Sequence, residues 1–150
     1  MSGSAVIGIG NLLLSDDGAG IHAVRFLQDK LPPGVTLVEG GVYGLDLLPY
    51  LEGRDKVIFI DALDAGENPG ALFRFTPRDV KPEQSTPAVS VHDLGLYELI
   101  GAAQLLDQCP EDIIIIAVQV KSLETGMELS PEVREALPHI HRLVLEEIGE

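Results

Sequence analysis

Three residues that can bind a metal ion, Asp17, Asp61 and His92, follow predicted strands or begin a predicted helix. Asp17 lies in the turn after an apolar run at residues 5–9, Asp61 directly follows the apolar run at 57–60, and His92 lies in the first turn of a predicted helix. Two carboxylates and an imidazole form a mixed oxygen and nitrogen ligand set for a divalent transition metal such as zinc or nickel. Either aspartate could also act as a catalytic general base, and the sequence does not decide between them.

Each of these residues also has an ordinary structural explanation when it is considered alone. Asp16 and Asp17 suit the start of a helix, where aspartate caps exposed backbone N–H groups, although capping explains one aspartate better than two. Asp61 could be a turn residue, and a lone histidine such as His92 is more often a structural or surface residue. A metal site therefore depends on whether the fold brings Asp17, Asp61 and His92 together.

Strand-like and helix-like patterns alternate along the chain. Apolar runs predict strands at residues 5–9, 35–38, 57–60, 72–75 and 113–120, with the fourth at an edge of the sheet. Helical spacing predicts helices at residues 18–31, 45–51, 90–106 and 131–148, and residues 77–90 form the longest predicted loop. This order predicts one domain over residues 1–150 with a three-layer α/β/α fold. Its sheet is doubly wound, twisted and mostly parallel, with about five strands.

The predicted topology gathers the candidate ligands on one side of the sheet. The carboxyl ends of parallel strands meet at one edge, and ligands of doubly wound folds bind beyond that edge. Asp17, Asp61 and His92 come from three separate connections on that side. The topology, and not the spacing in the sequence, therefore predicts a site.

The composition excludes several classes of partner. Ten Lys and Arg against 24 Asp and Glu give a formal charge of −14, which disfavours nucleic acids and anionic membrane surfaces. No apolar run is long enough to insert across a membrane, and a single cysteine fits a reducing compartment, so we expect a cytoplasmic protein. Cys109 precedes the last predicted strand, away from the candidate site, and is expected to be a core or surface residue rather than a nucleophile. The segment that begins at Gly8 and Gly10 does not predict a dinucleotide-binding site, because Leu13 stands where that motif requires its third glycine.

Several segments resemble, in order, the motifs of the nickel–iron hydrogenase maturation endopeptidases. The first is the glycine-rich and acidic segment at residues 8–20, and the later ones lie at residues 39–44, 59–62, 91–96, 122–126 and 129–131. The resemblance covers essentially the whole chain, and several motifs together are much more specific than any one of them. It implies a twisted sheet between helix layers, which agrees with the fold predicted from the patterns.

The resemblance also implies an activity and a site. Enzymes of this family remove a short C-terminal extension from the hydrogenase large-subunit precursor after nickel insertion. The metal-contacting positions of the family fall on Asp17, Asp61 and His92, which are the residues that the topology had selected. Nickel would arrive with the precursor, and zinc or cadmium could substitute for it in vitro. Hydrolysis could use a metal-polarised carbonyl or water with Asp17 or Asp61 as the base.

Two positions depart from the family pattern. Glu39-Gly40-Gly41-Val42 stands where Asp-Gly-Gly-Thr is common, and the valine removes one polar contact with a substrate backbone. Lys121 stands where a proline is usual. Both positions bear on which precursor is preferred and leave the three candidate ligands untouched.

Two other functions use some of the same residues. A phospho-receiver signalling domain would also have an acidic pair after the first strand, an aspartate at the end of the third and a lysine after the fifth. It needs its acids at the strand tip, however, whereas Asp16 and Asp17 follow Asn11 only after four further residues. A non-catalytic nickel chaperone would use Asp17, Asp61 and His92 without hydrolysis.

Overall fold

A computed structural model describes residues 3–79 and 92–149, with the side chains of residues 92–94 outside the description. The strands are β1 (Ser4–Ile9), β2 (Val35–Gly41), β3 (Lys56–Leu63), β4 (Leu72–Phe75) and β5 (Asp112–Gln119). The helices are α1 (Ala19–Phe26), α2 (Leu48–Leu51), α3 (His92–Leu105) and α4 (Pro131–Ile148). Short 3-10 helices are η1 (Ser15–Gly18), η2 (Leu45–Leu47) and η3 (Pro77–Asp79). Residues 80–90 of the predicted loop and the predicted helix start at 90–91 lie outside the described residues.

The five strands form one sheet in the order β2-β1-β3-β5-β4. The β1–β2, β1–β3 and β3–β5 pairs are parallel, and β4 is antiparallel to β5 at the edge. The chain passes from β1 to β2 on one side and then to β3 on the other, so the winding reverses between β1 and β3. This arrangement confirms the doubly wound, mostly parallel sheet and the edge position of the fourth strand.

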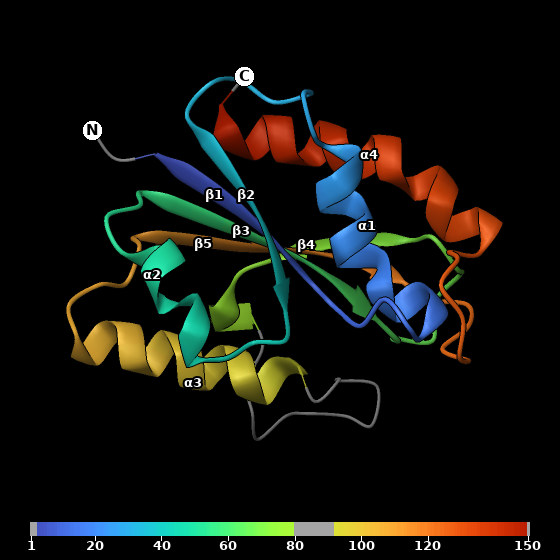
Figure 1. Cartoon of the computed structure of the whole chain (residues 1–150), viewed down its shortest axis with the longest axis horizontal. Coiled ribbons are helices and arrows are strands. Elements are labelled where there is room, and N and C mark those ends of the chain that lie inside the picture. The colour runs from blue at the N-terminus through green and yellow to red at the C-terminus, as the bar shows by residue number, and fades with distance from the viewer. Residues whose placement is uncertain (1–2, 80–91, 150) are drawn as a thin grey trace.

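Helices cover both faces of the sheet (Figure 1). Helices α1 and α4 pack on one face, over a core that includes Val6, Ile58 and Ile116. Helices α2 and α3 cover the other face, over a core that includes Ile7, Phe59 and Ile115. Neighbouring residues of β1, β3 and β5 therefore enter opposite cores, which explains why these central strands are apolar almost throughout.

Two helix predictions need correction: one helix ends earlier than predicted, and the other is divided. Helix α1 ends at Phe26, five residues before the predicted end, and the chain turns at Asp29, which has a φ of 64°. The predicted helix at residues 45–51 is divided into η2 and the four-residue α2, with Pro49 in the first turn of α2. The helical spacing of apolar residues continues past the end of α1 and across the boundary between η2 and α2. It therefore did not predict either feature.

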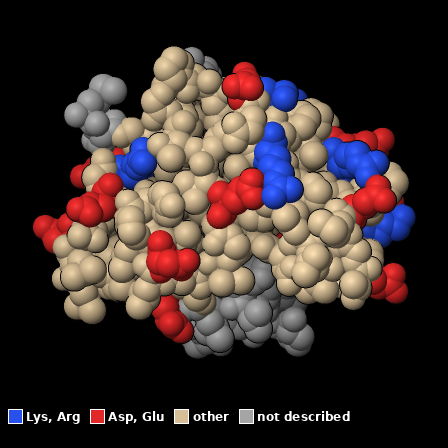
Figure 2. Space-filling model, in the orientation of Figure 1, with Lys and Arg blue, Asp and Glu red and all other residues tan. Residues whose placement is uncertain are grey.

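The charged side chains are mostly paired or exposed to solvent. Ion pairs join Arg25 to Glu39, Arg74 to Glu146 and Lys121 to Glu132. On the face drawn in Figure 2, acidic and basic side chains lie in scattered groups separated by uncharged areas. Surface pairs of this kind contribute little to stability.

The close approach of α1 to the sheet requires glycine at position 20. A Cβ atom on Gly20 would collide with the carbonyl oxygens of Ile60 and Ile9. We expect Gly20→Ala to lower the free energy of unfolding by about 3 kcal/mol or more, because the backbone of α1 must move away from that of β1 and β3. Urea unfolding measures the change.

Gly101→Ala is the matched control for this prediction. Gly101 lies inside α3, and apart from its chain neighbours and the nearby backbone of the helix itself, no atom lies within 4 Å of its ideal Cβ position. Alanine there should leave stability unchanged or raise it by up to about 1 kcal/mol through helix propensity. Equal unfolding midpoints for the two variants would contradict the steric argument.

Candidate active site at the carboxyl edge of the sheet

The turn after β1 folds η1 back against the end of the strand. Gly10 makes this turn with a φ of 145°, and its N–H donates a hydrogen bond to the Gly41 carbonyl at 2.6 Å. A Cβ atom at position 10 would collide with the Asp17 carbonyl oxygen. Glycine therefore permits the tight return that places Asp17 beside the carboxyl ends of β1 and β2.

Asp17 is half-buried and is tied to the loop before it. Its Oδ2 accepts a hydrogen bond from the Asn11 N–H at 3.0 Å, and the Asn11 side-chain oxygen accepts one from the Leu13 N–H at 2.9 Å. Asp17 is not at the N-cap position of either helix, since these positions are Leu14 for η1 and Gly18 for α1. These bonds fix the Asp17 side chain relative to the end of β1.

Asp61 lies within β3 and not after it, which corrects the predicted strand end. The β1–β3 pairing stops at Gly8 and Ile60, but β5 stays paired with β3 through Asp61, Ala62 and Leu63. Asp61 therefore projects beyond the last partner residue of β1, at the point where the winding of the sheet reverses. Its side chain is 5% exposed, and its Oδ1 accepts a hydrogen bond from the Ala62 N–H at 2.7 Å.

Asp17 and Asp61 lie at the same edge of the sheet. Segment η1 contacts β3, and Gly20, three residues after Asp17, lies against the carbonyl of Ile60, the neighbour of Asp61. Ligands of doubly wound sheets usually bind beyond the carboxyl ends of the strands at such a switch point. The structure thus brings the two predicted carboxylates to one edge.

His92 is the first residue of α3, and its side chain lies outside the described residues. The next part of α3 lies beside the segment after β2, because Gly95 is close to the backbone of Tyr43. The Tyr43 ring in turn contacts Phe59 of β3 edge-on, with ring centroids 5.2 Å apart. Among the side chains that the structure describes, no three His, Cys, Asp or Glu residues are arranged to hold a metal ion.

Asp16 has a different role from its neighbour. It is fully buried, and its carboxylate accepts hydrogen bonds from the backbone N–H groups of Lys121, Ser122 and Ser130 at 2.8 to 3.0 Å, and from the Ser130 hydroxyl at 2.8 Å. Burial by itself would raise the pKa of Asp16, but these hydrogen bonds outweigh burial and lower that pKa. Asp16 is therefore an ionised structural group that binds the segment after β5.

Further hydrogen bonds to backbone carbonyls join the turn after β1 to the segment after β5. The Ser15 N–H and hydroxyl donate to the carbonyls of Gly126 and Glu124 at 2.8 and 2.7 Å, and the Gly126 N–H donates to Leu13 at 2.9 Å. Figure 1 shows the segment after β5 beside η1. The suggestion that Asp16 caps a helix was wrong, because its partners lie more than 100 residues away in the sequence. In the sequence, the only sign of these contacts is the presence of two serines, Ser122 and Ser130, in the segment after β5. Both donate their N–H groups to Asp16, and Ser130 also donates its hydroxyl.

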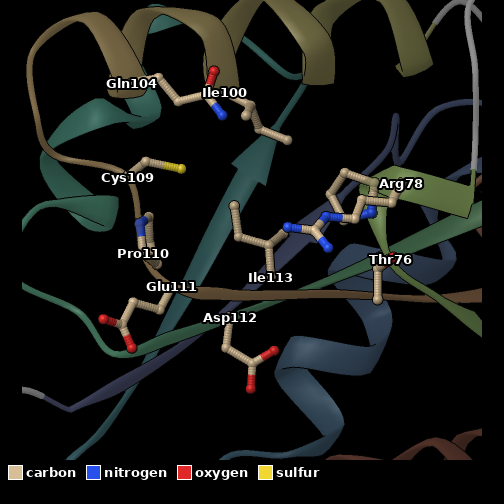
Figure 3. Close-up of a pocket in the computed structure, with 10 residues that line it drawn as sticks. Thr76, Arg78, Ile100, Gln104, Cys109, Pro110, Glu111, Asp112 and Ile113 are labelled. Atoms are coloured by element: carbon tan, nitrogen blue, oxygen red, sulfur yellow. The ribbon is translucent and has the colours of Figure 1, made fainter.

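A separate pocket of about 450 Å³ lies at the opposite end of β5. Ile100 and Gln104 of α3 line one side of it, Arg78 of η3 another, and Cys109 lies between α3 and β5 (Figure 3). Burial raises the pKa of the Cys109 thiol, which disfavours the nucleophilic thiolate. The predicted role of Cys109 as a non-nucleophilic residue agrees with this environment.

The chain is similar to known proteins over nearly its whole length. The family model for hydrogenase maturation protease (HycI) matches residues 21–147. The hydrogenase expression/formation protein HupD of Bradyrhizobium diazoefficiens is 38% identical over 88% of this chain and 70% of its own length. The hydrogenase 2 maturation protease of Escherichia coli is 33% identical over 85% of this chain and 79% of its own.

Among the described residues, no helix is both long and apolar enough to traverse a lipid bilayer.

Solved structures of the same kind share the fold. The hydrogenase maturating endopeptidase HybD from E. coli superposes with a TM-score of 0.83 and 28% identity, covering 98% of this chain and 94% of its own. HybD from Thermococcus kodakarensis gives a TM-score of 0.79 and 26% identity, covering 99% of both chains. These likenesses indicate a class of small α/β peptidases. The chain belongs to the hydrogenase maturation protease family, and the resemblance in its sequence motifs is thereby confirmed.

Proposed function

We propose that this peptidase removes a C-terminal extension from the large-subunit precursor of a nickel–iron hydrogenase, in the cytoplasm and after nickel insertion. Family membership supports the peptidase activity and a role in hydrogenase maturation. The observation that carries the proposal is that Asp17 and Asp61 lie at one edge of the sheet, where its winding reverses. An acidic edge of this kind suits a protein substrate that brings its own cation.

The proposed contacts with nickel come from Asp17, Asp61 and His92. Carboxylate and imidazole groups are suitable donors for nickel, and zinc or cadmium would compete for the same set in vitro. Asp61 is nearly buried, so a bound cation would offset the cost of keeping its charge away from water. Nickel belongs to the precursor in this proposal, and the enzyme contacts it only while the two proteins are bound.

The same residues would position the scissile peptide for hydrolysis. Asp17 or Asp61 takes a proton from the attacking water, whose oxygen adds to the carbonyl carbon while nickel stabilises the developing negative charge. The carbon–nitrogen bond then breaks, and the leaving amine takes up the proton. The reaction consumes one water and yields a new carboxylate on the large subunit and a free C-terminal peptide.

Nickel-loaded precursor should be cleaved and nickel-free precursor should not. Purified enzyme is mixed with each form of the precursor, and mass spectrometry records the loss of the C-terminal peptide. Equal cleavage of the two forms would contradict the role of nickel. Binding of nickel-loaded precursor without any change in mass would instead support a chaperone.

A further inference from the structure

Exposed apolar side chains gather around the candidate site. Six of the nine large apolar side chains that are exposed among the described residues follow β1, β2 or β5, the strands whose carboxyl ends form this edge. Leu13 is 58% exposed, Val42 62% and Leu45 60%. We call the whole group the apolar collar: Leu13, Leu14, Val42, Leu45, Leu123 and Met127.

Backbone contacts join the three segments that carry the apolar collar. The segments after β1 and β2 meet through the hydrogen bond from Gly10 to Gly41 at 2.6 Å. The segments after β1 and β5 meet through the bridge between Leu14 and Gly126. The segments that carry the collar are therefore joined through their backbones beside Asp17, although Met127 also lines a groove with His22 and Phe26 of α1.

The first two segments of the collar carry no charge. Residues 10–15 and 40–45 contain no Asp, Glu, Lys or Arg, although 23% of the chain is charged and its net charge is −14. Between them lies a groove of about 300 Å³, lined partly by Gly10, Gly41 and Val42. Glu39 also lines the groove, but Arg25 binds its carboxylate through two hydrogen bonds at 3.0 and 3.1 Å. A partner that covers these segments therefore meets an uncharged surface.

We propose that the apolar collar docks an apolar patch on the folded surface of the precursor, beside the segment that is cleaved. This inference rests on the proposed function. Contiguous apolar patches on a protein surface commonly mark interaction sites, and this one is continuous with the candidate active site. The groove has room for a length of extended chain, whereas the collar extends across three connections and so fits a folded partner.

The test compares two pairs of exposed apolar residues. Leu13→Ser/Val42→Ser removes two collar side chains, and Leu105→Ser/Leu106→Ser removes two exposed leucines, 89% and 57% exposed, at the end of α3. We expect the collar variant to raise the KM for nickel-loaded precursor about tenfold, with kcat within twofold of the parent. The α3 variant should keep both constants within twofold. Both variants should unfold at the parent temperature, because the replaced side chains are exposed.

Ionic strength gives a second measurement. Docking through the uncharged segments at residues 10–15 and 40–45 predicts that the ratio between the KM of the collar variant and the KM of the parent changes less than twofold between 50 and 500 mM salt. Charge-driven contacts that both enzymes share weaken equally with salt (about a threefold shorter screening length over this range) and cancel in the ratio. A collar variant with the parent KM, or equal losses in both variants, would overturn the docking proposal. So would a dimer of this chain that the collar substitutions dissociate without affecting cleavage. If the parent enzyme leaves the precursor intact, the proposed function itself fails, so the two failures are distinguishable.

Discussion

Asp61→Asn should abolish cleavage of the nickel-loaded precursor, lowering kcat/KM by about 10³-fold or more. Asparagine has nearly the same shape and keeps an oxygen that can accept the Ala62 N–H, so the end of β3 should be preserved. The amide cannot carry the negative charge that attracts a cation, and it cannot take a proton from water. Measuring precursor cleavage by mass spectrometry, with thermal unfolding as a check on folding, gives the result.

Asp29→Asn is the control for this experiment. Asp29 is exposed after α1 and has a φ of 64°, a conformation that asparagine tolerates as well as aspartate. The control removes one negative charge and should cleave at the parent rate. Cleavage by Asp61→Asn within tenfold of the parent would show that Asp61 is neither a ligand nor the base.

The same assay on Asp17→Asn separates the two carboxylates. A variant that lacks the base should lose kcat, whereas one that lacks only a contact with the substrate-borne nickel should mainly raise KM. Because the Asn11 N–H can still bond to an amide oxygen, the loop after β1 should keep its position.

Asp16→Ala should lower the free energy of unfolding by about 3 kcal/mol, and it should also slow cleavage. The substitution leaves three backbone N–H groups and one hydroxyl without the acceptor that now binds them, in a place that excludes water. Asp16→Asn keeps the volume but offers one accepting oxygen instead of two, so its loss should be intermediate. Urea unfolding measures stability, and cleavage at fixed precursor concentration measures the effect on the neighbouring Asp17.

Asp79→Ala is a matched control for Asp16. Asp79 is exposed in η3 and accepts two bonds from Thr76, at 2.8 and 3.3 Å, in a turn that water can enter. Its removal should cost only about 1 kcal/mol or less. If the two alanine variants unfold at the same urea concentration, the buried network of Asp16 does not stabilise the protein as argued.

Apolar runs predicted the sheet well because burial on both faces leaves a strong mark in the sequence. The runs at β1, β3 and β5 read as covered strands, and the less buried β4 read as an edge strand, as the structure confirms. The alternation of strands with helices then gave the doubly wound topology, which in turn selected Asp17 and Asp61. His92 was selected in the same way, and its role as a ligand stays a prediction.

Contacts between distant segments could not be predicted in this way. The end of β3 depends on pairing with β5 and not on the apolar run itself, so Asp61 lies inside a strand although the run ends at Ile60. Asp16 and Asp17 are adjacent and identical in type, yet one is buried beneath residues 121–130 and the other lies half-exposed. Their difference arises from which way η1 faces, and local spacing carries no information about that.

The order of the strands has a consequence for how the enzyme is made on the ribosome. Strand β4 leaves the ribosome before β5, but its partner in the sheet is β5, and β5 also completes the free side of β3. The carboxylate of Asp16, likewise, gains its full set of hydrogen-bond donors only after residue 130 has been synthesised. Nascent chains that end before β5 carry β1, β2 and β3 with an open sheet edge, and those that end before Ser130 have an η1 that is only partly secured. Peptidase activity should therefore begin only after residue 130 has left the ribosome.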